Sequence, residues 1–299
     1  MANPDICVIT NIGLCHLENL ITRDGILKAK TESFAHLTPD GIAVLNGDDD
    51  KLCDKKVVNG NRQCSMVSKR LPKWLKQRKE LRRLPRNGYA TNVEAVDLTG
   101  TKAAIHYPSK ETGGEVTMEV TIPIAGEHNV YNALAAVSVA RELGLTCDEM
   151  KRGIESVQTI GGRSNLIHKN GITIIDDCYN ANPVSMKASL DVLRDAKGRK
   201  VAILGDMGEL GENEEQMHAE VGYHAAKNKI DLLICTGKSA AIWQKQPWQT
   251  AAVAKCCRFP TMEALLTCLP SLIQSGDTVL VKASHFMHFE KVVEKLCQL

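Results

Sequence analysis

The sequence lacks the features that would place the protein in a membrane or on a nucleic acid. It has no apolar run long enough to cross a bilayer and no secretory signal pattern. Lys plus Arg total 37 against 35 for Asp plus Glu, so no excess of positive charge favours DNA, RNA or an anionic membrane as partner. Internal repeats are also missing. We therefore expect a cytoplasmic protein without membrane insertion or nucleic-acid binding.

Paired cysteines are missing as well. None of the 11 cysteines belongs to a CxxC pair, and an odd number does not suit a complete disulfide framework. Several of them, such as Cys235 and Cys256, stand among apolar residues. This pattern predicts reduced, buried thiols, as in cytoplasmic proteins.

The order of strand and helix patterns predicts two α/β domains. Residues 5–10 and 41–45 are apolar strands, and residues 89–124 alternate in the manner of an antiparallel meander inserted in the first domain. After residue 160, strands alternate with helices, which predicts a parallel, doubly wound, Rossmann-like sheet. Its predicted strands are 172–175, 201–204, 232–235, 257–259 and 278–281, and its predicted helices are 185–195, 214–227, 239–245, 262–274 and 288–298. The predicted domains are residues 1–160 and 161–299.

The segment from Gly161 to Met186 carries the densest group of candidate site residues. A Gly-Gly-Arg turn ends at Arg163, and the predicted strand 172–175 runs into Asp176 and Asp177 before a helix begins. Open α/β sheets bind ligands at the carboxyl ends of their parallel strands. An arginine just upstream could meet a phosphate in the same cleft. We interpret this segment as a joint between the two domains that also carries chemistry.

Two glycine-containing loops of the second domain do not fit a phosphate-binding role. Gly205 to Gly211 follows a strand, but its glycine spacing is not that of a dinucleotide loop, and Asp206 and Glu209 would repel a pyrophosphate. Gly237-Lys238-Ser239 resembles the end of a P-loop, yet Leu232 stands where the first glycine belongs. The sequence offers no other candidate loop, which argues against a dinucleotide-dependent oxidoreductase.

Four polar features admit both a structural and a functional interpretation. His16 follows a strand, where it could cap or pack, or help to hold a divalent cation. Asp48 to Asp50 form either a turn or a wall of a nucleotide cleft. Asn129 and Asn132 share the first turn of a predicted helix and could read an adenine edge. The basic stretch 69–86 fits a solvated helix face better than a nucleic-acid or membrane patch.

Several motifs resemble, in order and spacing, those of the Mur ligases. They are ITNIGLCHLENL with GILKAKTE, AVLNGDDD, GEHNVYNALAA, GGRSN, IIDDCYNANPVSM, ILGDMGELG and VLVKASHFM, and they span nearly the whole chain outside the basic stretch. DDCYNANP and GDMGELG are typical of the branch that adds D-Ala-D-Ala. The Asp-Asn-Pro-Arg signature of a sister branch is not found.

The resemblance implies an ATP-dependent amide ligase of cytoplasmic peptidoglycan precursor synthesis. ATP would phosphorylate the terminal carboxylate of UDP-N-acetylmuramoyl-tripeptide, and the amine of D-Ala-D-Ala would attack the resulting acyl phosphate. Mg²⁺ would neutralise the phosphate charge. The implied cofactors are thus ATP and Mg²⁺, the implied partners are the two substrates, and we expect a monomer.

The resemblance also assigns roles to individual residues. The implied catalytic residues are Lys30, His16 and Arg163, and His16 and Lys30 (as a carbamate) would also hold the metal. The implied cofactor contacts are Asn129 and Asn132 at the adenine, Arg163 at the γ-phosphate and Asp177 at the ribose. The implied substrate-binding residues are Tyr179, Asn180, Asn182, Lys282 and Ser284.

The sequence departs from the family pattern in two respects. The family's N-terminal UDP-sugar-binding domain and its P-loop would precede residue 1, so we expect residues 1–160 to be the C-terminal portion of the central domain and the chain alone to be inactive. Lys282-Ala283-Ser284-His285 stands where Lys-Gly-Ser-Arg is usual, which removes an expected arginine contact. The alternative is a non-catalytic binding or interaction protein derived from a ligase.

Overall fold

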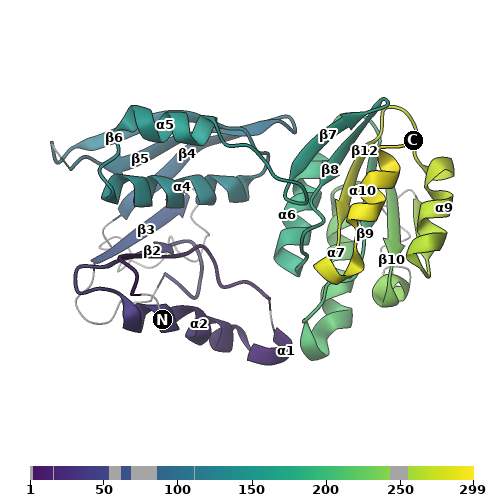
Figure 1. The fold of residues 1–299 in the computed structure, drawn as a ribbon, viewed down its shortest axis with the longest axis horizontal. Coiled ribbons are helices and arrows are strands. Elements are labelled where there is room, and N and C mark those ends of the chain that lie inside the picture. Colours follow the sequence, from purple (N-terminus) through teal and green to yellow (C-terminus); the bar gives the residue numbers. More distant parts are fainter. Residues whose placement is uncertain (1–2, 16, 54–61, 69–85, 111, 243–254) are drawn as a thin grey trace. The chain divides into compact units, whose positions relative to one another are not determined.

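The computed structural model describes residues 3–15, 17–53, 62–68, 86–110, 112–242 and 255–299. These fall into two compact units (Figure 1), each described here by itself: unit 1 comprises Met1–Gly13, Leu20–Val96 and Gly100–Val157, and unit 2 comprises Leu14–Asn19, Asp97–Thr99 and Gln158–Leu299. His16 and the predicted helix face within 69–85 lie outside the described residues. Within the described ranges, we find no helix with the length and apolarity needed to traverse a membrane.

The sheet of unit 1 is parallel at one end and antiparallel at the other. Strands β1 (Ile6–Ile9), β2 (Ile42–Asn46), β3 (Arg62–Ser68) and β4 (Arg86–Val96) pair in parallel in that order. Strand β4 then pairs antiparallel with β5 (Gly100–Pro108), and β5 with β6 (Glu115–Ile122). The predicted antiparallel meander is confirmed, and it continues the same sheet because β4 belongs to both parts.

Helices cover this sheet through apolar residues spaced three and four apart. Helix α4 (Glu127–Glu142) buries Val130, Leu134 and Val137 against β2 to β5. Helix α5 (Cys147–Glu155), which the sequence did not predict, packs on β6 and begins with a capping box between Thr146 and Glu149. Helix α2 (Arg23–Thr31) continues into a 3₁₀ turn (Glu32–His36), and the short α1 spans Leu17–Leu20.

Unit 2 contains the predicted doubly wound sheet, with strand order β11-β10-β9-β12-β8-β7. The five predicted strands are present and parallel to one another: β8 (Ile172–Asp176), β9 (Lys200–Leu204), β10 (Leu232–Thr236), β11 (Lys255–Phe259) and β12 (Thr278–Lys282). Strand β7 (Asn165–Lys169) was not predicted and adds an antiparallel edge beside β8.

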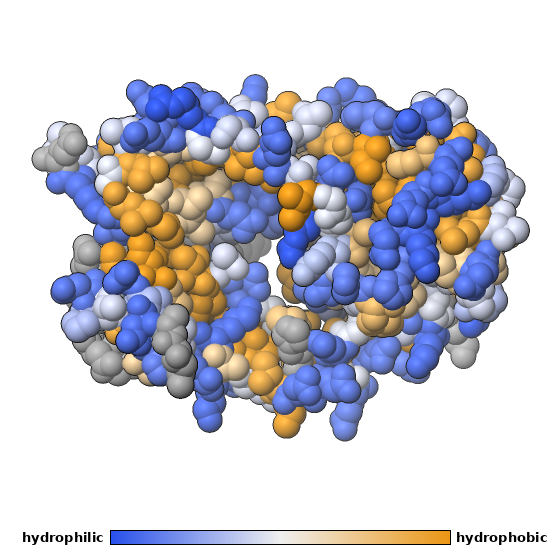
Figure 2. Space-filling model, viewed as in Figure 1, coloured by the Kyte–Doolittle hydropathy of each residue, from blue (hydrophilic) through white to orange (hydrophobic). Residues whose placement is uncertain are grey.

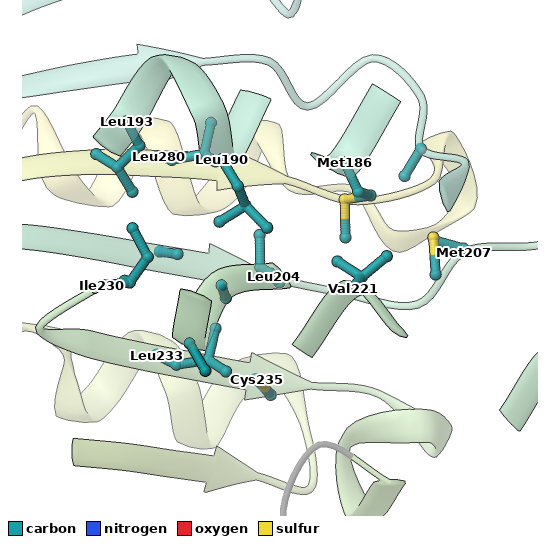
Figure 3. Packing of buried hydrophobic residues seen from close by; sticks show 14 of the residues in the cluster. Met186, Leu190, Leu193, Leu204, Met207, Val221, Ile230, Leu233, Cys235 and Leu280 are labelled. Carbon is teal, nitrogen blue, oxygen red and sulfur yellow. The ribbon is translucent and has the colours of Figure 1, made fainter. Parts of the chain in front are cut away.

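Both faces of the inner strands β8, β9, β10 and β12 are buried, which explains why these strands are mainly apolar. Along β9, Ala202 and Leu204 face α6 (Pro183–Arg194) and α7 (Glu214–Lys227), where Figure 3 shows Leu190 and Val221 close to Leu204. Val201 and Ile203 belong to the opposite core, with α9 (Met262–Leu272) and α10 (Glu290–Leu296).

The predicted helices of unit 2 are confirmed, with one exception. The described part of 239–245 begins with a 3₁₀ turn, Lys238–Ala241, and residues 243–245 lie outside the described range. The outer sides of the helices that face the viewer in Figure 1 are mainly hydrophilic in Figure 2, as amphipathic helices require. None of the ten cysteines whose side chains are described forms a disulfide.

Candidate functional site

The topology of unit 2 brings three loops together at the carboxyl end of the sheet. The chain proceeds from β8 over β9 and β10 to β11, and then returns to place β12 between β8 and β9. This reversal is the switch point at which open α/β sheets bind ligands. The loops after β8, β9 and β12 begin at Asp177, Gly205 and Ala283 and form this edge.

The two aspartates at the end of β8 hold the turn that carries Arg163. The backbone N–H of Gly162 donates to Oδ2 of Asp176 at 2.7 Å, and the N–H of Ser164 donates to Oδ1 of Asp177 at 3.0 Å. The backbone N–H of Tyr179 closes the arrangement by donating to the Gly162 carbonyl at 2.9 Å. These hydrogen bonds join the turn to the end of β8, so the two segments form one rigid substructure.

Glycine is needed at position 162 for two reasons. Its φ of 78° lies in the left-handed region. A Cβ there would also approach Cβ of Tyr179 to 3.2 Å and the Tyr179 nitrogen to 3.3 Å. The close fit of this turn against the Tyr179 backbone therefore excludes most side chains at position 162.

The side chain of Arg163 is exposed and rests on an aromatic ring. Its guanidinium carbon lies 3.9 Å from the centroid of the Tyr179 ring, a cation–π arrangement. The other partner of Tyr179 is His285, whose ring centroid lies 5.5 Å away at an interplanar angle of 41°. Within the described residues Arg163 has no carboxylate partner, so its charge is available to an anionic ligand.

Lys282, at the end of β12, is buried and bonded to the loop that follows β8. It is 3% exposed, and its ammonium donates to Oδ2 of Asp177 at 2.6 Å and to the Asn180 carbonyl at 3.0 Å. The Lys282–Asp177 pair is therefore a charge-assisted bond within the protein. It fixes the relative positions of β12 and the loop after β8.

Ser284 is also engaged inside the protein. It is 4% exposed; its hydroxyl oxygen accepts from the Gly208 N–H at 2.9 Å, and its own N–H donates to the Asp206 carbonyl at 3.0 Å. Asn182 caps α6 by accepting from the Ser185 N–H at 2.9 Å. Tyr179 and Asn180 are exposed. The substrate-binding roles of these residues and of Lys282 stay predictions.

The structure explains why the Gly237-Lys238-Ser239 loop is no phosphate cradle. Its amides already bind an anion, because the Asp206 carboxylate accepts from Lys238 N–H at 2.8 Å and from Ser239 N–H at 3.0 Å. Asp206 is 6% exposed, and a Cβ on Gly237 would lie 2.5 Å from its carboxylate. The loop after β9 is thus tied to the loop after β10.

In unit 1, the predicted adenine contacts lie together at the start of α4. The Asn132 amide donates to Oδ1 of Asn129 at 3.0 Å, and the Asn129 amide donates to the Ala125 carbonyl at 2.9 Å. Asn129 is buried and Asn132 is exposed. Asn132 is therefore the exposed member of this pair, and the role of both residues at an adenine stays a prediction.

The acidic run after β2 has the internal contacts of a structural turn. Asp49 accepts from the Ile12 N–H at 2.8 Å, Asp50 pairs with Arg23, and the Tyr131 hydroxyl donates to Asp48 at 2.8 Å. The sequence left two interpretations open for this run, a turn or a wall of a nucleotide cleft. The turn accounts for these contacts.

Of the two residues predicted to hold a metal, only Lys30 is described. Its side chain is exposed, and its ammonium donates to the Asn11 carbonyl at 2.9 Å. An ammonium is a donor and does not ligate a cation unless it is modified. In the described part of the chain no group of three or more His, Cys, Asp or Glu side chains could hold a metal ion. The assignment of His16 and Lys30 to a Mg²⁺ site stays a prediction.

Cys178, between Asp177 and Tyr179, is expected to resist alkylation in the folded chain. Burial, followed by its bond to the Asp176 carboxylate, raises the pKa of this thiol from 9.0 to about 12. At pH 8.5 its thiolate fraction should fall roughly a thousand-fold, and iodoacetamide labelling followed by mass spectrometry should find it unmodified while the partly exposed Cys297 reacts. In urea both thiols should react, and rapid labelling of native Cys178 would contradict this placement.

The same shift has a consequence for stability. The unfolded thiol ionises near its ordinary pKa of 9.0, whereas the folded thiol stays protonated until about 12. Ionisation therefore favours the unfolded state, and stability is lost as pH rises from about 9 towards 12.

Sequence reasoning did not assign the contacts of several residues that build this edge. Asp176 and Ser164 hold the Arg163 turn, Ser189 contacts Asp177, and Asp206 closes the Gly237 loop. The adjacent aspartates were a usable signal for Asp176. Nothing in the sequence pairs Ser189 with a carboxylate twelve residues earlier.

Comparison with known proteins matches both parts of the chain to family models. Residues 1–140 match the Mur ligase middle domain, and residues 162–285 match the Mur ligase glutamate ligase domain. The UDP-N-acetylmuramoyl-tripeptide–D-alanyl-D-alanine ligase of Bacillus subtilis is 32% identical over 306 residues, covering 100% of this chain and 60% of the relative. The chain thus spans less than two thirds of the length of this relative.

Solved structures give the same match. A MurF structure from Acinetobacter baumannii superposes with a TM-score of 0.82 at 31% identity, covering 99% of this chain and 60% of that one. MurF from Thermotoga maritima, solved in complex with ADP, has a TM-score of 0.76 at 26% identity and covers 99% of this chain and 62% of its own.

Proposed function

The chain belongs to the Mur ligase family, and we propose that it supplies most of the nucleotide- and dipeptide-handling part of a ligase that joins D-Ala-D-Ala to UDP-N-acetylmuramoyl-tripeptide. The observation that carries the proposal is the anchoring of the Arg163 turn by Asp176 and Asp177 at the switch point of the unit 2 sheet. This arrangement presents a fixed, exposed cation where such sheets bind ligands. We assign residues 1–160 to the central domain and 161–299 to the C-terminal domain.

In the proposed reaction, ATP activates the tripeptide carboxylate as an acyl phosphate, which the dipeptide amine then attacks. Arg163, placed over the Tyr179 ring, would meet the γ-phosphate and stabilise its charge as transfer proceeds. Asp177 would accept a ribose hydroxyl, because among the described residues Oδ1 has only one donor, the Ser164 N–H. Asn132 would accept from the adenine amino group, with Asn129 orienting it.

The remaining assigned residues fit the proposal to different degrees. Tyr179 and Asn180 are exposed at the same edge and would contact the incoming dipeptide. Lys282, Ser284 and Asn182 support the loops that carry those contacts. Lys30, as a carbamate, and His16 would provide oxygen and nitrogen ligands for Mg²⁺, whose role would be to neutralise phosphate charge. In this proposal the protein acts as a monomer in the cytoplasmic synthesis of peptidoglycan precursors.

A chimera tests this function. The 299-residue chain would replace the matching region of the Bacillus subtilis relative, and ATP-dependent addition of D-Ala-D-Ala to UDP-N-acetylmuramoyl-tripeptide would be followed by mass spectrometry. We expect the chimera to form the amide product and the 299-residue chain alone to form negligible product, because its sequence holds no phosphate loop and that loop acts together with the other groups at phosphoryl transfer.

Two outcomes would contradict the proposal in different ways. Ligation by the 299-residue chain alone would show that no phosphate loop is required. A chimera that melts cooperatively and binds ADP but forms no product would favour the alternative, a binding protein derived from a ligase. Reactions without ATP serve as the control for both.

A further inference from the structure

The Asp177 carboxylate is saturated on one oxygen and open on the other. Oδ2 lies 2.6 Å from the ammonium of Lys282 and 2.6 Å from the hydroxyl of Ser189. Oδ1 accepts from the Ser164 N–H at 3.0 Å and from no other group in the described part of the chain. A carboxylate oxygen accommodates about two donors. The remaining acceptor position is therefore on Oδ1, the side of the Arg163–Ser164 turn.

Ser189 reaches Asp177 from the second turn of α6 and is buried, with an exposure of 6%. Its hydroxyl also lies 2.9 Å from the Ser185 carbonyl, the usual helical acceptor four residues earlier. The single hydroxyl proton goes to Asp177, because that contact is shorter and the acceptor is charged. Ser189 thus donates its one hydroxyl proton to a carboxylate that already forms an ion pair with Lys282.

We propose that Ser189 is a positioning residue that, together with Lys282, occupies Oδ2 of Asp177 and so directs a ligand hydroxyl to Oδ1. This inference rests on the proposed function, in which Asp177 meets the ribose of the nucleotide. Two donors on one oxygen prevent rotation of the carboxylate about its Cβ–Cγ bond. Loss of the Ser189 donor would open an acceptor position on Oδ2, where a ligand hydroxyl would compete with Lys282.

The substitution Ser189→Ala removes the donor and leaves the helix otherwise unchanged. Ser138→Ala is a matched control, because Ser138 is 5% exposed, lies within α4 and donates only to the carbonyl four residues earlier, at 2.8 Å. Both variants would be made in the 299-residue chain, and their melting temperatures would verify folding. A second variant, Ser189→Thr, retains the hydroxyl and should keep most of the affinity.

Binding would be measured by ¹H–¹⁵N NMR titration with ADP and with 2′,3′-dideoxy-ADP, using the Ser164 amide as reporter because it donates to Asp177. We expect Ser189→Ala to weaken ADP binding about five-fold, a loss of the size that one ordinary hydrogen bond contributes. It should leave dideoxy-ADP binding unchanged, because that ligand has no ribose hydroxyl to orient. Ser138→Ala should change neither. Titrations with 2′-deoxy-ADP and 3′-deoxy-ADP identify the hydroxyl concerned.

The outcomes separate this inference from the function on which it rests. If Ser189→Ala weakens ADP and dideoxy-ADP equally, or weakens neither, Ser189 does not direct a hydroxyl, although nucleotide binding stands. If wild type binds both ligands equally, Asp177 does not meet the ribose and the inference fails. If millimolar ADP shifts no resonance of unit 2, the nucleotide assignment of Asp177 fails as well.

Discussion

Substitution of Lys282 by methionine is expected to lower the free energy of unfolding by about 3–5 kcal/mol, the usual cost of removing one partner of a buried ion pair. Methionine has nearly the same length and keeps the packing of the stem, so the loss would report the charge. The Lys282 side chain is 4% exposed and that of Asp177 is 15% exposed. Without the ammonium, Asp177 would keep only Ser189 and the Ser164 N–H as donors.

A surface pair provides the control for this experiment. Lys187 and Glu220 form a contact of the same type at 3.0 Å, but their side chains are 33% and 47% exposed. Lys187→Met should therefore change stability by less than about 1 kcal/mol. Urea denaturation followed by circular dichroism measures both variants. Equal effects of the two substitutions would show that burial does not govern the Lys282 pair.

The double substitution Lys282→Met with Asp177→Leu tests the reason for the loss. When both partners of a buried pair become apolar, no charge is left without a partner, and the stability should return in part. The return would be incomplete, because Ser189 and the Ser164 N–H would then lose their acceptor. If the double variant is as unstable as Lys282→Met alone, the loss of stability comes from altered packing and not from an unpaired charge.

The fold of unit 2 was predictable because its inner strands are buried on both sides. The run at 201–204 must place Val201 and Ile203 against one layer of helices and Ala202 and Leu204 against the other, so it contains no polar residue. Strand β7 escaped prediction because it lies at the sheet edge. Its residues are partly or fully exposed, so it lacks the apolar run that identifies the inner strands.

The candidate site was predictable only where it depends on residues that are close together in the sequence. Asp177 follows a strand and Arg163 precedes it, and this order placed both at one edge of the sheet. Burial and bonding of Lys282 depend on where β12 is inserted, and the sequence of strands along the chain does not reveal that β12 lies beside β8. Residues over 100 positions apart form contacts of this kind across the sheet, and such contacts can be identified only when the fold is known.

Substitution of Arg163 by alanine in the chimeric ligase is expected to lower kcat by about 10³-fold, the effect seen when an arginine that stabilises a transferring phosphoryl group is removed. The side chain is exposed, stacks on Tyr179 and has no carboxylate partner in the described residues, so its loss should leave the fold intact. Arg163→Lys should be impaired to a smaller extent, because lysine keeps the charge but lacks the planar guanidinium that stacks on the ring.

Arg194 supplies the matched control for this last experiment. Its guanidinium pairs with Asp195 at 2.9 Å at the end of α6, with a side-chain exposure of 49%, so Arg194→Ala should leave kcat near the wild-type value. The distinction between kcat and KM identifies the role of Arg163. A charge that acts on the phosphate as transfer proceeds lowers kcat when it is removed, whereas a contact made equally in the bound ATP raises KM alone. An Arg163→Ala enzyme with unchanged kcat and a raised KM for ATP would therefore place Arg163 in binding and not in phosphoryl transfer.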